Sequence, residues 1–115
     1  MYFITMVNID HRQITDSKVI GAFEDKQEAE DKIMANDNAI FIKGEDSYYD
    51  YAIIAQIQEG FQEESTDIKW FKYNRTEEDV EIETETFGKE TIKKVIIDIK
   101  PVNVPQGFED YKPTL

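Results

Sequence analysis

Hydrophobic and polar positions alternate along most of this chain, and the alternation predicts a mainly antiparallel β-sheet. Each alternating run is rich in β-branched and aromatic residues and is bounded by polar, turn-forming residues, as strands are. The polar stretch Asp10–Ser17 predicts a turn between the first two runs. The runs expected to be strands are Tyr2–Ile9, Val19–Phe23, Ala39–Lys43, Tyr48–Gln58 and Asp67–Asn74.

One segment, EDKQEAEDKIMAN, changes to helical spacing and predicts a helix over about residues 26–36. Asp25 can cap this helix, and Glu28, three positions later, completes a capping box. The helix should pack on the sheet through one apolar stripe, formed by Ala29, Ile33 and Met34.

The final alternating unit reads as a hairpin with Gly88 and Lys89 as a two-residue loop. This loop pairs Phe87 with Glu90, which brings apolar residues of the two strands opposite each other on one side. The resulting apolar pairs are Ile82 with Val95 and Val80 with Ile97, and on the other side Glu83 faces Lys94 while Glu81 faces Ile96. Three prolines after Lys100 predict an irregular tail over residues 101–115.

These elements predict an α+β fold with an antiparallel sheet of about five to seven strands and one helix packed on it. With 115 residues the chain is too short for two ordinary domains, so one domain over residues 1–115 is expected. Neither a signal peptide nor an apolar run of about 18 residues is visible, which favours a cytoplasmic protein without a membrane partner.

Charge narrows the classes of partner. The chain has 25 acidic and 13 basic residues, and its formal net charge is -12. Such a field repels the phosphates of nucleic acids and anionic membranes, so direct nucleic-acid binding is not expected. The same field attracts basic proteins, including proteins that themselves bind nucleic acid, although acidic surfaces also simply maintain solubility.

Catalytic and cofactor motifs are not found in the sequence. There is no Cys, and the one His, His11, lies in a polar turn without a neighbouring nucleophile. The five glycines are scattered and form no phosphate-binding loop, and the NDN stretch at Asp37 lacks the glycine and distal Glu of a calcium loop. We therefore expect a non-enzymatic protein with no cofactor and no metal site, although a pair of converging carboxylates would be invisible at this level.

The run TEEDVEIETET carries the most distinctive charge pattern. Alternation places three glutamates on one strand face, about 6.8 Å apart, against ~3.4 Å between phosphates along one DNA strand. The row could imitate a short stretch of nucleic acid, or it could be a solvated face that discourages edge pairing. The candidate partner-binding residues are Glu77, Glu78, Asp79, Glu81, Glu83 and Glu85, with Glu63 and Glu64 as extensions.

Three segments also match a recurring pattern: VIGAFEDKQEAEDKI from Val19, YAIIAQIQEGF from Tyr51 and IKWFKYN from Ile68. Over residues 2–74 the chain resembles small uncharacterised domains of bacteriophages and Gram-positive bacteria, with a strand-to-helix element, a later strand and a WYkw-type strand. The resemblance brings no catalytic residues. It implies a phage or prophage context, in which small acidic proteins often occupy host defence enzymes.

Together these features lead to the expectation of an acidic phage-type protein that binds, and inhibits, a basic host protein in the host cytoplasm. A nucleic-acid-binding defence nuclease is the expected kind of target. The alternative is a phage structural or assembly accessory protein that self-associates, for example as a homodimer, through apolar strand edges or a tyrosine-rich surface that includes Tyr48, Tyr49 and Asp50.

Overall fold

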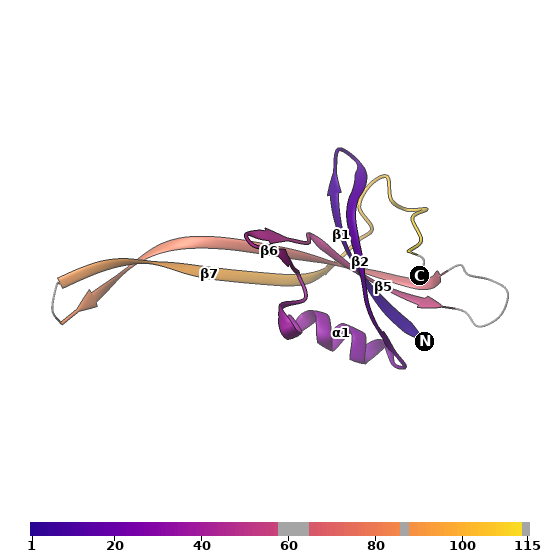
Figure 1. The fold of residues 1–115 in the computed structure, drawn as a ribbon, viewed down its shortest axis with the longest axis horizontal. Coiled ribbons are helices and arrows are strands. Elements are labelled where there is room, and N and C mark those ends of the chain that lie inside the picture. Colours follow the sequence, from indigo (N-terminus) through magenta and orange to yellow (C-terminus); the bar gives the residue numbers. More distant parts are fainter. Residues whose placement is uncertain (58–64, 86–87, 114–115) are drawn as a thin grey trace.

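The structure is a computed structural model that describes residues 1–57, 65–85 and 88–113, with the backbone alone for residues 57 and 65–67. Figure 1 shows one helix beside a sheet from which a long hairpin projects. The sheet is antiparallel and its five strands have the order β2-β1-β5-β6-β7, while β3 and β4 form a small separate hairpin. The expected α+β class is confirmed.

The elements follow the chain in a simple order. The strands of the main sheet are β1 (Tyr2–Asp10), β2 (Gln13–Phe23), β5 (Tyr51–Ile57), β6 (Ser65–Thr84) and β7 (Gly88–Val102). Between β2 and β5 lie the helix α1 (Lys26–Met34), the 3-10 turn η1 (Asp37–Ala39) and the short strands β3 (Ile42–Gly44) and β4 (Ser47–Tyr48).

Two apolar clusters cover the two faces of the sheet. On the helix side, Ala29 and Ile33 of α1 pack with Phe41 and with Ile54 and Phe71 of the central strands. On the opposite face, the residues around the single tryptophan are Val7, Ile53, Trp70 and Phe108. Trp70 is only 1% exposed because the segment after β7 folds back over it, with Phe108 and Tyr111 rings 6.3 Å from the indole.

The helix is shorter than the sequence predicts. Asp25 caps it by accepting a hydrogen bond from the Gln27 N–H, and the chain leaves helical geometry at Asn36, whose φ is +50°. Ala29 and Ile33 are fully buried as expected, but Met34 is 47% exposed, so its expected place on the sheet is wrong. The helix ends at Met34, one residue after the buried Ile33, and successive residues are rotated by about 100° around a helix, so this side chain points away from the buried stripe.

Strand β6 differs most from expectation, because two units that the sequence separates are one strand of 20 residues. Its first part is the expected strand Asp67–Asn74, and its second part is the first strand of the expected hairpin. The tail also begins later than expected. Pro101 lies in β7 opposite Phe71, at the sheet edge where a proline is tolerated.

The β1–β2 connection is strained. His11 and Arg12 form a two-residue loop, and both have positive φ, +50° and +64°. Such a loop twists in the same sense as the strands, but it favours Asn and Gly because a Cβ atom crowds the backbone at positive φ.

Phe108→Ala should release the cover over Trp70. Loss of a buried phenyl ring is expected to lower the free energy of unfolding by about 3 kcal/mol, and the emission of the single tryptophan should shift to longer wavelength. Urea unfolding followed by fluorescence measures both effects. Val104→Ala, at a position 38% exposed in the same segment, is the matched control and should change stability by less than about 0.5 kcal/mol.

Arg12→Gly should stabilise the protein, because glycine adopts positive φ without steric cost. The expected gain is about 0.5–1 kcal/mol in thermal or urea unfolding. Gln13→Gly, one residue later in the extended strand β2, should instead destabilise it. Equal effects of the two substitutions would contradict strain at this turn.

Candidate functional site

The most prominent feature outside the packed body is the hairpin of β6 and β7. These strands form fifteen cross-strand pairs, but β5 lies beside β6 only as far as Lys72. We call residues 73–85 and 88–99 the arm. At ~3.4 Å per residue, its twelve paired positions from Tyr73 to Thr84 extend ~40 Å as a two-stranded ribbon. The arm accounts for the elongated shape of the molecule, 68 × 32 × 24 Å (Figure 1).

Tyr73 anchors the root of the arm. Its N–H donates a 2.9 Å hydrogen bond to the Asp50 carbonyl, at the point where β5 begins. Its ring stacks on Phe41 at 4.6 Å and on Tyr48 at 5.8 Å, and burial raises the pKa of its hydroxyl. Arg75 then lies over the Tyr48 ring at 5.0 Å. Aromatic packing therefore fixes the direction in which the arm leaves the body.

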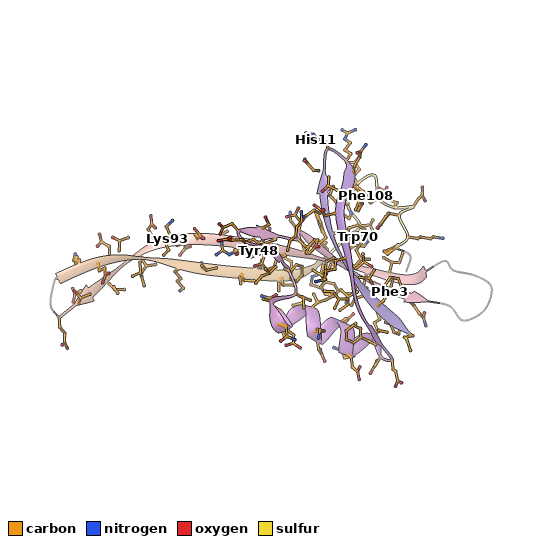
Figure 2. All side chains as sticks on the ribbon, in the orientation of Figure 1. Phe3, His11, Tyr48, Trp70, Lys93 and Phe108 are labelled. Atoms are coloured by element: carbon orange, nitrogen blue, oxygen red, sulfur yellow. The ribbon has the colours of Figure 1, made fainter. Side chains whose placement is uncertain are left out.

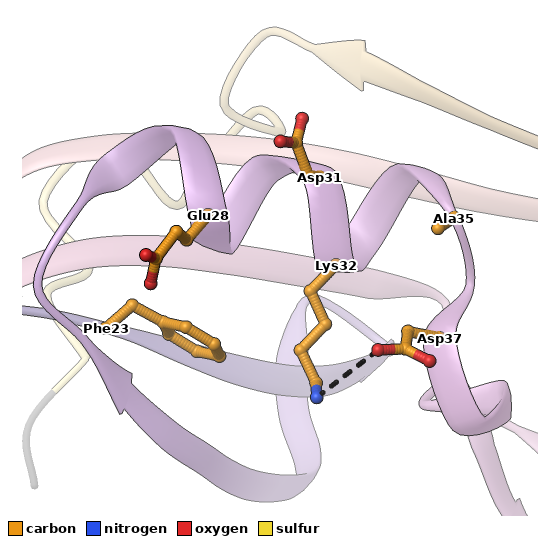
Figure 3. Close-up of a pocket in the computed structure, with 6 residues that line it drawn as sticks. All are labelled: Phe23, Glu28, Asp31, Lys32, Ala35 and Asp37. Atoms are coloured by element: carbon orange, nitrogen blue, oxygen red, sulfur yellow. Dashed lines mark ion pairs between the residues drawn. The ribbon is translucent and has the colours of Figure 1, made fainter.

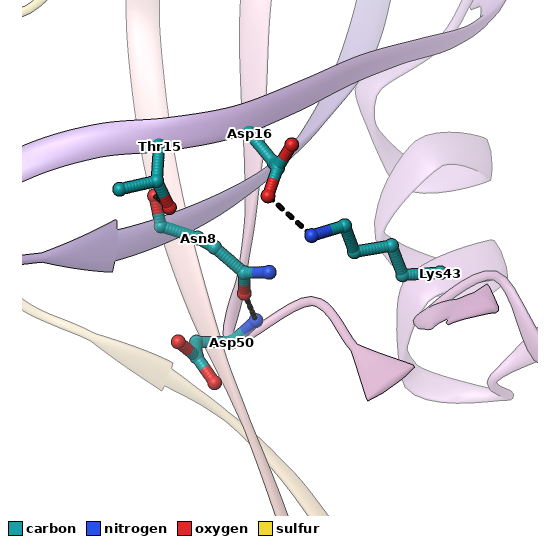
Figure 4. Close-up of polar contacts among 5 residues, drawn as sticks. All are labelled: Asn8, Thr15, Asp16, Lys43 and Asp50. Atoms are coloured by element: carbon teal, nitrogen blue, oxygen red, sulfur yellow. Dashed lines mark hydrogen bonds and ion pairs between the residues drawn. The ribbon is translucent and has the colours of Figure 1, made fainter. Parts of the chain in front are cut away.

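Polar contacts hold in place the region around β3–β5, which supplies the partners of Tyr73 at the root of the arm (Figure 4). Asn8 of β1 accepts a 2.8 Å hydrogen bond from the Asp50 N–H, and Asp16 of β2 forms an ion pair with Lys43 of β3. Partial burial raises the pKa of the Asp50 carboxyl, and the positive charge of Lys72 opposes that rise. The two contacts tie β1 and β2 to the β3–β5 region.

The expected acidic residues lie on the arm as a row. Residues at odd positions of β6 share one face of the ribbon, which at the root carries Phe71 and Tyr73 of the helix-side core. Four carboxylates occupy successive odd positions, Glu77, Asp79, Glu81 and Glu83, which we call the acidic row. Of the other candidates, Glu78 lies on the opposite face, Glu85 lies in the turn after β6, and Glu63 and Glu64 lie outside the described residues.

Lysines of β7 lie directly beside the acidic row. Asp79 is paired across the hairpin with Lys93, and Glu83 with Lys89. Ion pairs form diagonally, from Lys89 to Glu81 and from Lys93 to Glu77, each at 3.9 Å. Glu77 also accepts a 2.8 Å hydrogen bond from Arg75. The face is thus acidic along β6 and basic along β7, rather than uniformly negative.

The register expected from the sequence is wrong. Val80 lies opposite Ile92 rather than Ile97, and Ile82 lies opposite Glu90 rather than Val95. Thr84 pairs with Gly88, so three residues separate the strands, and Gly88 adopts φ +80°, as glycine does at the end of a three-residue hairpin loop. This register places opposite charges across the hairpin at three positions, Glu78–Lys94, Asp79–Lys93 and Glu83–Lys89.

The arm also exposes apolar side chains. Ile82, Ile92, Val95 and Ile97 are all more than one-third exposed, and three of them, Ile82, Val95 and Ile97, belong to the apolar pairs expected from the sequence. No strand or helix of the described chain covers either face of the distal ribbon, so alternation does not lead to burial there. The exposure of these side chains could have been predicted from the length of the hairpin strands, which exceeds the length of the neighbouring strand β5.

Concave surfaces offer little by comparison. A hollow of about 370 Å³ beside α1 is lined by Phe23 and by charged helix residues, and its Lys32 pairs with Asp37 at 3.7 Å (Figure 3). His11 is at the exposed β1–β2 turn, away from the arm (Figure 2). Within residues 1–57, 65–85 and 88–113, no three metal-ligating side chains converge, and no helix is long and apolar enough to cross a membrane.

Comparisons of the chain with protein-family models, characterised proteins and solved structures find no match. A projecting ribbon with carboxylates on one strand, lysines on the other and exposed Ile and Val side chains can contact another protein through charge pairs, apolar packing and backbone hydrogen bonds.

Engineered disulfides can test the register of the arm, because the native chain has no Cys. Val80→Cys with Ile92→Cys should form a disulfide, since these residues are directly opposite. Val80→Cys with Ile97→Cys should not, because the second position is five residues, roughly 17 Å, further along β7. Mass spectrometry after mild oxidation of the monomer distinguishes the two pairs.

Asp50→Asn tests the electrostatics of the root. Because the pKa of the Asp50 carboxyl is raised in the folded state, its charged form opposes folding at neutral pH, and that opposition disappears as the pH falls through the folded pKa. The variant should therefore be more stable than the wild type at pH 7, and the difference should vanish at low pH. Urea unfolding across this pH range gives the measurement, and a difference independent of pH would contradict the assignment.

Proposed function

We propose that this chain is a non-enzymatic binding protein that uses the acidic row of the arm to engage a positively charged surface of another protein. The observation that carries the proposal is the row itself: four carboxylates at alternate positions on a ribbon that projects from the body. They span about 20 Å, because alternate strand residues are ~6.8 Å apart.

Electrostatics supports a basic partner. The net charge of -12 attracts cationic proteins over roughly a Debye length, about 8 Å at physiological salt, and speeds their encounter. Asp79 and Glu83 make no ion pair with another described side chain, so their charge remains available. A partner would approach along β6, because the lysines of β7 repel a cationic surface.

The arm also provides reach. A ribbon ~40 Å long and two strands wide can enter a groove that a compact body cannot. A nucleic-acid-binding groove is one such surface, since it carries cationic side chains along its length. In the phage context that the sequence resemblance implies, a host defence nuclease fits this description, and occupation of its groove would inhibit it. The neighbouring lysines make the row a weaker imitation of a phosphate strand than the sequence pattern predicts.

A triple variant tests this proposal. Asp79→Asn, Glu81→Gln and Glu83→Gln remove three charges from the acidic row while keeping side-chain size, and they spare Glu77, which binds Arg75. The control removes three exposed charges from the body: Glu24→Gln, Glu28→Gln and Glu45→Gln. Each immobilised protein is exposed to lysate of a bacterial host, and the retained proteins are identified.

The wild type and the control should retain the same basic proteins, and release them as NaCl is raised, because salt screens charge pairs. The arm variant should lose most of that retention while keeping the wild-type urea unfolding curve. Equal retention by all three proteins would overturn the acidic row as a binding surface.

A further inference from the structure

Strand β7 forms one edge of the main sheet, and this edge is unusually regular. Its pairing with β6 runs from Val102 to Gly88 without a register shift. The other edge strand, β2, is interrupted by two irregularities in its pairing with β1, and Gly21 adopts φ +55° there. Bulges of this kind protect an edge from pairing with other chains, and β7 has no such bulge between Gly88 and Val102.

The exposed edge contains a self-complementary segment. In Lys94–Asp98, with the sequence KVIID, a positive residue and a negative residue flank three apolar ones. An antiparallel copy of this segment centred on Ile96 would place Val95 opposite Ile97 twice and Lys94 opposite Asp98 twice. Opposite charges and β-branched pairs at directly facing positions stabilise antiparallel strands.

We propose that β7 pairs with β7 of a second copy of this chain, antiparallel and about a twofold axis at Ile96, to form a four-stranded ribbon β6-β7-β7-β6. Val95 and Ile97, which are 44% and 45% exposed in the single chain, become neighbours of their counterparts on one face. The pairing extends from Ile92 to Lys100, beyond which Pro101 lacks an N–H to donate.

Symmetry selects this register. A twofold axis perpendicular to two antiparallel strands passes through the centre of a residue pair, so one residue must face its own copy. Centring on Lys94 would oppose the two Lys94 side chains and also Glu90 with Asp98, and centring on Ile97 would oppose Lys94 with Lys100. Centring on Val95 leaves Lys94 facing Ile96. Of these registers, the one centred on Ile96 is therefore the one that combines apolar pairs with pairs of opposite charge.

A second copy is favoured over a different protein as the partner, because the segment Lys94–Asp98 provides both the apolar and the oppositely charged residues that would face it. The ribbon would leave the acidic rows along its two outer strands, so dimer formation is compatible with the proposed function but does not depend on it. Salt separates the two: it weakens binding of a basic partner, whereas it relieves the mutual repulsion of two copies with net charge -12.

Charge exchange tests the pairing. Lys94→Asp and Asp98→Lys each place like charges opposite one another in the homodimer, and each should weaken dimerisation at least about tenfold. An equimolar mixture of the two variants should form a heterodimer, because every facing pair is again of opposite charge. Lys93→Asp is the matched control, since Lys93 also faces an acid within its own hairpin but would face Ile99 of the second copy.

Sedimentation equilibrium measures these states, and hydrogen exchange of β7 amides reports folding. The expected result is a wild-type dimer strengthened by NaCl, weakened by either single variant and restored in the mixture. Ile96→Cys should also form a disulfide-linked dimer, whereas Thr91→Cys should not. A wild type that stays monomeric, a monomeric mixture, or single variants that dimerise as the wild type does would each overturn the pairing, whatever the acidic row binds.

Discussion

The arm exists because strands of unequal length lie side by side. β5 begins at Tyr51, so β6 has neighbours on both edges only up to Lys72, yet β6 and β7 continue for twelve more pairs. Where the arm begins, β6 is tied to the body by the hydrogen bond of the Tyr73 N–H with the Asp50 carbonyl, reinforced by the stacked rings of Phe41 and Tyr48. A two-stranded ribbon is marginal in water by itself, so these root contacts matter to everything beyond them.

The packed sheet and the arm differ in the interactions that orient their side chains. Within the sheet, burial decides which side chains face inward, as Trp70 and Phe71 show on opposite faces. On the arm, no helix or strand of the described residues covers the ribbon. The register there coincides with cross-strand charge pairs and with the turn at Gly88. The consequence is a surface with acids on β6, lysines on β7 and uncovered Ile and Val side chains on both strands.

The two strands of the arm have separate chemical characters. β6 offers carboxylates and suits a cationic partner, while the outer edge of β7 offers a regular backbone and a self-complementary segment. A single ribbon can carry both properties because its edges point in opposite directions. In the proposed dimer, the β7 edges become internal and the acidic rows remain outermost, which doubles the acidic surface without hiding it.

The sequence by itself determined the sheet-rich fold class, the Asp25-capped helix and the concentration of acids in one segment, because alternation, capping and net charge are local or additive properties. It also placed Ala29 and Ile33 correctly on the sheet. It did not determine the start of β2, since Gln13–Ser17, expected as part of a turn, pair with β1. Tertiary structure alone decided that residues 65–84 form one strand, that Met34 is exposed, and that Val80 faces Ile92. The physical reason is that matching apolar residues predicts register only where a face of the strands becomes buried, and the start of β5 at Tyr51 is set by its contacts with β1 and β6 rather than by the residues of the arm.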